Sequence, residues 1–226
     1  MQERKVHLMF KQLYLSSFGY FISGVLQVVG RIFHPFMVYG YWNKPTRSFR
    51  KLTRISSTAV LNERNKINIG ENCWIWHHTI VDGSNGVSIG DGVQIGAWVG
   101  IFTHGSHLTI RLLGKKYIDF DKNNRIGYVR SSVEVGDYTF IASGVSIMPG
   151  VKIGKGCIIT AGSVVTKDIM NYSIASGNPA RCVGSTLELD RRYFSNPIVK
   201  ENYFDSEAME KHLANEKKRR DKAKTS

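Results

Sequence analysis

Four of the seven histidines lie in two short segments, and their side chains suit chemistry near neutral pH. His77 and His78 are adjacent, and His104 is followed three residues later by His107. An imidazole has an ordinary pKa near ~6.5, so it can accept a proton as a general base or bind zinc through an unprotonated nitrogen. The histidines alone therefore leave two chemistries open, proton transfer and metal-assisted catalysis.

A repeat of six residues runs through the segment that carries these histidines. Its twelve aliphatic members are Ile69, Ile75, Val81, Ile89, Ile95, Ile101, Val135, Ile141, Ile147, Ile153, Ile159 and Val165. A period of six fits neither a helix nor an alternating strand. It predicts a parallel β-helix, in which each hexad forms a short strand and a turn and three hexads, about 18 residues, complete one coil.

The repeat is interrupted twice, and both interruptions lie beside candidate site residues. The step from Val81 to Ile89 is eight residues and contains Asp82, and residues 108–132 separate the hexad of His104 and His107 from the next repeat. A long excursion from a regular solenoid usually carries function. We therefore expect an extruded loop over 108–132 at the edge of the site.

Composition and charge distinguish the regions of the chain outside the repeat. Its 226 residues are 42% apolar and carry a net charge of +13, of which residues 1–66 contribute +9 and residues 67–204 only +2. Residues 12–30 contain no charged side chain. They predict an apolar helix, with three alternatives: packing on the body or a neighbouring subunit, an interfacial membrane helix assisted by nearby arginines, or a spanning helix slightly shorter than usual.

Three cysteines, Cys73, Cys157 and Cys182, have neither metal-type spacing nor an even number. They favour free thiols in a reducing compartment, and hence a cytoplasmic protein, with the inner face of the membrane as an alternative location. We expect residues 1–66 to form a basic, partly apolar helical segment, residues 67–184 the β-helix, and residues 185–226 a helical, basic extension. A nucleic-acid partner is not expected, because no recognisable binding module accompanies the charge.

Two further motifs end the repeat, GSVVTKDI at residues 162–169 and GNPAR at 177–181. With the hexads and the histidine-bearing turn, they resemble the hexapeptide-repeat acetyltransferases, especially galactoside and maltose acetyltransferases and the O-acetyltransferases of capsule and O-antigen polysaccharides. The resemblance covers about residues 67–184. It implies an all-β, left-handed parallel β-helix, a homotrimer, and an acetyl-CoA site between adjacent subunits with no metal requirement.

Carried over residue by residue, the resemblance implies a cofactor site and a base. The cofactor-binding positions are Ser143, Ala161, Thr166, Lys167 and Arg181. Lysine and arginine suit the nucleotide end of CoA because they donate charge-assisted hydrogen bonds to phosphate. The resemblance favours His107 as the general base that deprotonates a sugar hydroxyl for direct attack on the thioester, with His104 as an orienting neighbour or an acceptor contact.

The acceptor is expected to be a saccharide of a cell-surface polysaccharide or its precursor. Asp82, His77 and Trp76 are candidate acceptor-binding residues, although Trp76 could instead pack against a neighbouring subunit. One alternative enzyme uses the same fold: a zinc carbonic-anhydrase-like protein with His77 or His78, His104 and His107 as ligands. The 162–169 and 177–181 motifs would have no role in that enzyme.

Overall fold

The computed structural model describes residues 16–19, 21–22, 24–25 and 34–225, and it divides into two units, Met1–Phe36 and Met37–Ser226. In the first unit, residues 17–19, 21–22 and 24–25 are helical. The remainder of the apolar segment 12–30 lies outside the described residues. Among the helices that are described, none is both long enough and apolar enough to cross a membrane.

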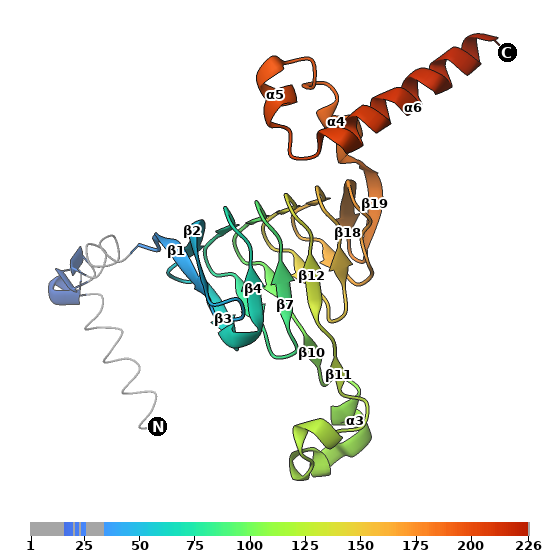
Figure 1. The fold of residues 1–226 in the computed structure, drawn as a ribbon. Coiled ribbons are helices and arrows are strands. Elements are labelled where there is room, and N and C mark those ends of the chain that lie inside the picture. Colours follow the sequence, from blue (N-terminus) through green and yellow to red (C-terminus); the bar gives the residue numbers. More distant parts are fainter. Residues whose placement is uncertain (1–15, 20, 23, 26–33, 226) are drawn as a thin grey trace, which may run out of the picture. The chain divides into compact units, whose positions relative to one another are not determined.

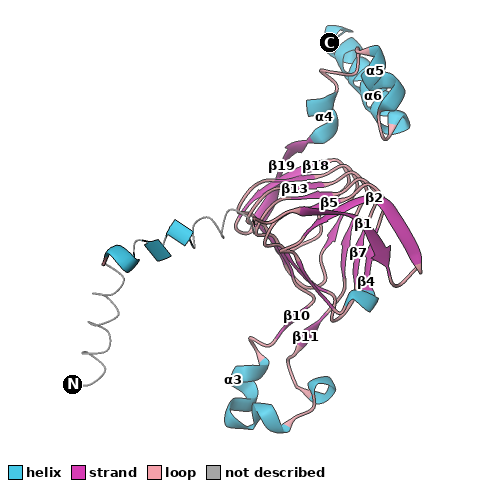
Figure 2. Cartoon of the chain, turned by 90° about the vertical axis from the view of Figure 1, so that its left-hand side faces the viewer, coloured by secondary structure: helices cyan, strands magenta, loops and turns pink. Residues whose placement is uncertain are grey.

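The second unit is built on three sheets whose strands stack along one axis (Figures 1 and 2). The first sheet contains, in spatial order, β1 (Met37–Asn43), β2 (Ser48–Ser56), β5 (Trp74–Ile75), β8 (Gln94–Ile95), β13 (Phe140–Ile141), β16 (Ile158–Ile159), β18 (Ser173–Gly177) and β19 (Ala180–Ser185). The second contains β17 (Val164–Val165), β14 (Ser146–Ile147), β9 (Gly100–Ile101), β6 (Ile80–Asp82) and β3 (Val60–Asn62). The third contains β15 (Lys152–Ile153), β12 (Val133–Val135), β7 (Val87–Ile89) and β4 (Ile67–Ile69). The chain visits the three sheets in turn, which confirms the predicted parallel β-helix.

The aliphatic repeat forms the core. All twelve of its members are at most 3% exposed. Strands that stack within a sheet lie 18 residues apart where the repeat is uninterrupted, since Val135 pairs with Ile153, Ile141 with Ile159 and Ile147 with Val165. Each buried isoleucine stabilises the fold by about 2 kcal/mol relative to an exposed one. Backbone hydrogen bonds between coils, such as that from Gly96 N to Ile141 O at 2.8 Å, satisfy the polar groups that this stacking buries.

The coils extend on both sides of the twelve-residue repeat. Arg54 and Ile55 in β2 pair with Trp74 and Ile75, and β3 pairs with β6, so the sheets begin before residue 67, where the sequence analysis places their start. A short 3-10 helix, η1 (Arg64–Lys66), joins β3 to β4. At the other end β18 pairs with β16. Ile55 and Leu61 already stand six residues apart, a signal that the boundary at residue 67 overlooks.

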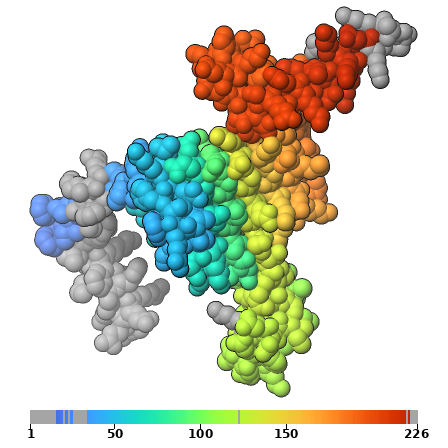
Figure 3. Space-filling model, in the orientation of Figure 1, coloured from blue at the N-terminus to red at the C-terminus, as the bar shows by residue number. Residues whose placement is uncertain are grey.

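The second interruption is an arm that projects from the body (Figure 3). It leaves the body through the two-stranded ribbon of β10 and β11 (Figure 1). β10 (His104–Gly105) pairs antiparallel with β11 (Val129–Arg130), and between them lie α3 (Thr109–Leu113), η2 (Gly114–Asp119) and η3 (Lys122–Asn124). His104 is directly opposite Arg130 in this ribbon. The ribbon therefore returns the end of the excursion to its starting point, beside the histidines.

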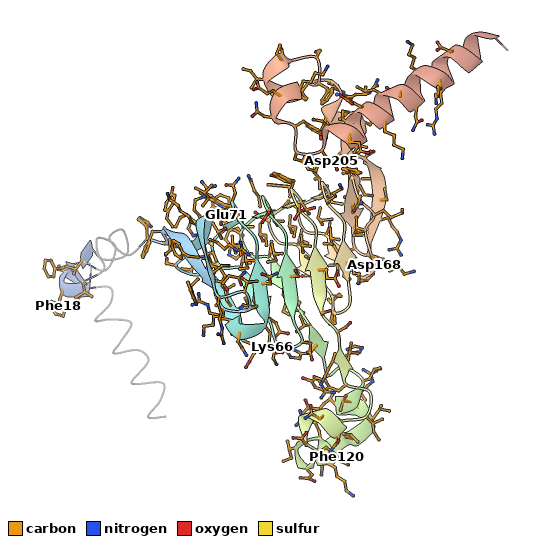
Figure 4. All side chains as sticks on the ribbon, viewed as in Figure 1. Phe18, Lys66, Glu71, Phe120, Asp168 and Asp205 are labelled. Atoms are coloured by element: carbon orange, nitrogen blue, oxygen red, sulfur yellow. The ribbon has the colours of Figure 1, made fainter. Side chains whose placement is uncertain are left out.

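Three helices follow the last strand, in the region where residues 185–226 are predicted to form a helical extension: α4 (Thr186–Asp190), α5 (Pro197–Asn202) and α6 (Ser206–Thr225). Met209 on α6 is fully buried. Asp205, labelled in Figure 4, pairs with Lys155 and accepts a hydrogen bond from Tyr172 on the last coil. This network attaches the C-terminal helices to the end of the β-helix.

The three thiols have different environments, which predicts different reactivities. Burial raises the pKa of Cys73 to about 11 and also raises the pKa of Cys157, whereas Cys182 is exposed. Because the thiolate is the reactive form, we expect iodoacetamide at neutral pH to alkylate one cysteine in the native protein and three after denaturation. Peptide mass spectrometry identifies the modified position. Rapid native labelling of Cys73 or Cys157 would contradict this burial.

Candidate active site

A buried carboxylate holds one of the candidate histidines at the corner between the second and third sheets. Asp82 ends β6, and His104 follows β9 one coil later, so the stacking of these strands brings them together. Nδ1 of His104 lies 2.7 Å from Oδ2 of Asp82. Thr103 donates to the same oxygen from its backbone N at 3.0 Å and its Oγ1 at 2.8 Å. The other oxygen accepts hydrogen bonds from the backbone N and hydroxyl of Ser84.

These contacts define the protonation of the pair. Burial by itself would raise the pKa of Asp82, but the hydrogen bonds from Ser84 and Thr103 outweigh it and hold the pKa well below its ordinary value. Asp82 is therefore an ionised carboxylate at neutral pH. Since a carboxylate only accepts, Nδ1 of His104 is the donor in this contact, and in the neutral ring Nε2 is then an acceptor, the form that a general base requires.

His104 opens into a polar cavity of about 330 Å³. The cavity is lined by Glu63, Lys66, Ser84, Asn85, His104, Asn123, Tyr128 and Arg130. The ring of Tyr128 stacks on the imidazole of His104 with centroids 5.9 Å apart and planes 3° apart. The guanidinium of Arg130 lies over the other ring of this stack, 4.4 Å from the Tyr128 centroid. The arm thus fixes the plane of the histidine as well as forming one wall.

His107 has a different environment. Its side chain is exposed and is not part of the cavity lining. Its backbone carbonyl accepts a hydrogen bond from Arg111 at 2.6 Å, but its ring makes no hydrogen bond or ion pair within the part of the chain that is described. The geometry of one chain therefore distinguishes two histidines that sequence reasoning treats as near equals.

The other candidates divide between two corners of the coil. Trp76 and Ser143 line a groove of about 460 Å³ after the first sheet, with Arg54, Trp74, Gln94, Ile95, Gly96 and Phe140. At this corner His77 bonds to the hydroxyl of Ser56 at 2.7 Å. Within one chain, Asp82 therefore lies at a different corner from His77 and Trp76, because one strand of the second sheet separates the two corners.

The predicted CoA-binding positions are divided in the same way. Ser143 and Ala161 follow the first-sheet strands β13 and β16, whereas Thr166 and Lys167 follow β17 at the corner of His104. Arg181 lies on β19, and Arg181, Thr166 and Lys167 are all exposed. Within one chain, the five positions therefore do not all share the corner of His104.

Glycine is required where the coils stack most closely at the first of these corners. A β-carbon on Gly96 would lie 2.6 Å from the backbone N of Ser143 in the next coil. Because the coils approach so closely, backbone atoms form the floor of the groove, and Ser143 is half-buried at its edge.

Comparison with known proteins agrees with this architecture. Residues 132–167 match the family described as bacterial transferase hexapeptide (six repeats). An acetyltransferase candidate of Saccharomyces cerevisiae is 38% identical over 126 residues, 55% of this chain and 58% of the relative. Serine acetyltransferase 4 of Arabidopsis thaliana is 29% identical over 187 residues, 78% of this chain and 48% of the relative.

Solved structures give the same type of match. The maltose O-acetyltransferase of Clostridium difficile is 31% identical, with a TM-score of 0.48, over 57% of this chain and 64% of that one. A galactoside acetyltransferase in complex with coenzyme A is 29% identical, with a TM-score of 0.49, over 59% and 62% of the two chains.

The structure is a parallel β-helix, and the hexapeptide-repeat match over residues 132–167 implies a left-handed coil. The relatives named above are acetyltransferases, which confirms the family resemblance predicted from the sequence. The chain spans about half the length of the curated relatives it matches. No comparison supports the carbonic-anhydrase alternative.

Proposed function

We propose that the protein is an acetyl-CoA-dependent O-acetyltransferase that acts on a sugar hydroxyl, with His104 rather than His107 as general base. The observation that carries this proposal is the Asp82–His104 pair beside a polar cavity of the β-helix, in which Nε2 makes no hydrogen bond within the described residues. The choice of His104 reverses the preference drawn from the sequence resemblance.

The proposed reaction uses this pair to activate an alcohol that is almost un-ionised at neutral pH. Nε2 of His104 accepts the hydroxyl proton as the sugar oxygen attacks the thioester carbonyl, and Asp82 stabilises the imidazolium that results. The bond from carbon to sulfur breaks, and the proton passes from His104 to the leaving thiolate. No covalent enzyme intermediate is needed because the thioester is already activated.

For the cosubstrate, we assign the exposed cations Lys167 and Arg181, with Thr166, to the nucleotide end of CoA, and the Ser143 and Ala161 corner to its pantetheine arm. Thr166 and Lys167 share a corner with His104, while Ser143 and Ala161 lie on the other. A homotrimer in which adjacent subunits contribute opposite corners brings the two halves together, which is how the relatives implied by the resemblance arrange their sites.

Asp82 provides a prediction with a matched control. Asp82→Asn is expected to lower turnover about 100-fold, because an amide can hold His104 in the wrong tautomer. Asp91 also accepts a backbone N–H from the neighbouring coil, so Asp91→Asn reproduces the loss of charge at a corner without a histidine and should keep normal turnover. Equal effects of the two substitutions would assign Asp82 a purely structural role.

The same carboxylate makes stability depend on pH. Its pKa is lower in the folded chain than in the unfolded chain, so its contribution is complete above the ordinary value of about 3.9 and is lost as the pH falls toward the folded value. The melting temperature should therefore fall less steeply from neutral to acid pH for Asp82→Asn than for the unsubstituted protein.

The function itself is tested by thiol release from acetyl-CoA across a panel of polysaccharides and free sugars. Acceptor-dependent release, with the product heavier by one acetyl group, is the expected result. No acceptor-dependent release, combined with stoichiometric zinc and CO₂ hydration, would replace the proposal with the carbonic-anhydrase alternative. A cell-surface polysaccharide or its precursor is the acceptor class that we assign first.

A further inference from the structure

We infer that the acceptor carries a negative charge, which Lys66 and Arg130 bind beside His104. This inference rests on the proposed function, since it takes the cavity of His104 as the acceptor site. The lining contains two cations, Lys66 and Arg130, and one carboxylate, Glu63. With His104 neutral in its base form, the lining side chains carry two positive charges and one negative charge. The ionised Asp82 lies behind His104, outside the lining, and its oxygens accept hydrogen bonds from Ser84, Thr103 and His104.

Neither cation is consumed by an ion pair within the described part of the chain. Lys66, labelled in Figure 4 at the edge of the body, donates from Nζ to the backbone oxygen of Ser84 at 3.0 Å. That bond uses one of the three ammonium protons and leaves two for a ligand. It also anchors the ammonium to the turn whose other groups bind Asp82, so the charge is held next to the proposed base.

Arg130 is oriented in a way that suits an anion. Its guanidinium lies 4.4 Å above the ring of Tyr128, which occupies one face of the group. The N–H groups of a guanidinium project in its plane, so stacking leaves them available for a bidentate contact with a carboxylate or phosphate. Because Tyr128 also stacks on His104, the anion-binding group and the base belong to one continuous stack.

The charge of the whole arm agrees with this assignment. Residues 108–132 carry six basic and two acidic side chains, while the rest of the segment 67–204 carries seven basic and nine acidic ones. Positive potential is therefore concentrated on the excursion that forms the wall of the cavity, where it would attract an anionic acceptor.

A second arginine of the arm serves as an internal comparison. Arg125 donates to the hydroxyl of Tyr117 and to the backbone oxygen of Phe120, both at 3.1 Å, and its guanidinium stacks on Tyr117 at 4.1 Å. It is not part of the cavity lining. Arg125 therefore supplies the same charge on the same arm without facing the site.

The test compares three sugars that differ only at C6: methyl β-D-glucuronide, methyl β-D-glucoside 6-phosphate and the neutral methyl β-D-glucoside. Their binding to the full chain is measured by titration calorimetry at low salt, separately from thiol release. We expect the glucuronide or the phosphate to bind about tenfold more tightly than the glucoside, with the difference shrinking in high salt. A carboxylate or a phosphate preference would each support the inference and would identify the anion.

The variants are Lys66→Gln, Arg130→Gln and their combination, with Arg125→Gln as the matched control. The double variant should remove the preference for the anionic sugar without changing glucoside binding, and Arg125→Gln should retain it. Equal binding of charged and neutral sugars, no measurable binding of either anionic sugar, or a preference that survives the double substitution would overturn the inference. A higher KM for acetyl-CoA in the double variant, with acceptor preference unchanged, would also overturn the inference, because it would assign Lys66 and Arg130 to CoA binding.

The two proposals fail separately. Binding of the anionic sugar that depends on Lys66 and Arg130, without transfer from acetyl-CoA to any acceptor, would contradict the acetyltransferase assignment and leave the anion site in place. Efficient transfer to neutral sugars only, with no anion preference, would support the acetyltransferase assignment and contradict the anion site.

Discussion

His104→Ala is expected to reduce the turnover of acetyl transfer by about three orders of magnitude while leaving the affinity for CoA within about twofold of normal. The substitution removes the only imidazole that both contacts Asp82 and opens into the polar cavity among the residues described. Single-turnover and steady-state thiol release, with CoA binding measured by calorimetry, separate the loss of chemistry from a loss of cosubstrate binding.

The informative comparison is His107→Ala. The ring of His107 makes no hydrogen bond or ion pair within the described residues, so its removal should lower turnover by less than about tenfold. The reverse pattern, near-normal turnover for His104→Ala and a large loss for His107→Ala, would assign the base to His107. Asp82 and His104 would then be left with a structural role at the corner.

Mixed oligomers should recover activity that neither parent variant has. His104→Ala removes the base, and Ala161→Trp fills the corner that we assign to the pantetheine arm; each variant alone should be inactive. If a trimer forms each site from opposite corners of two neighbours, a mixed trimer contains one site in which both halves are intact. Mixed trimers isolated with two affinity tags should therefore show about one third of normal activity.

The control for this recovery places both lesions in the same half of the site. Trimers that combine His104→Ala with Asp82→Asn subunits should remain close to the residual activity of Asp82→Asn, because every site then has a damaged base. Inactivity of the His104→Ala and Ala161→Trp mixture in confirmed mixed trimers would instead place the complete site within one chain. Recovery is the expected result because Ser143 and Ala161 lie at a different corner of the coil from His104.

The β-helix was predictable because its determinant is local and repeated. Residues such as Ile141 and Ile159 enter the same core at intervals set by the length of a coil, so their spacing is visible without knowing any contact. The boundary at residue 67 was placed too late for the same reason. Ile55 and Leu61 form only one six-residue step before an eight-residue gap, which is too short a run to distinguish from chance.

The candidate site was predicted only in part. The sequence identified His104, His107 and Asp82 as chemistry-bearing residues, but it could not pair them. Asp82 and His104 are 22 positions apart and meet only because β6 and β9 stack in register. Tyr128 and Arg130 were missed because no pattern in residues 108–132 predicts that the end of the arm pairs with β10.

By itself, therefore, the sequence determined the fold class, the six-residue repeat and the family resemblance, since all three depend on residue spacing along the chain. Only the tertiary structure decided which histidine has a carboxylate partner, which corner each candidate occupies and which cations face the cavity. The physical reason is that coil stacking and ribbon closure bring distant residues within hydrogen-bonding distance, and it is at this range that a protonation state is set and an anion is bound.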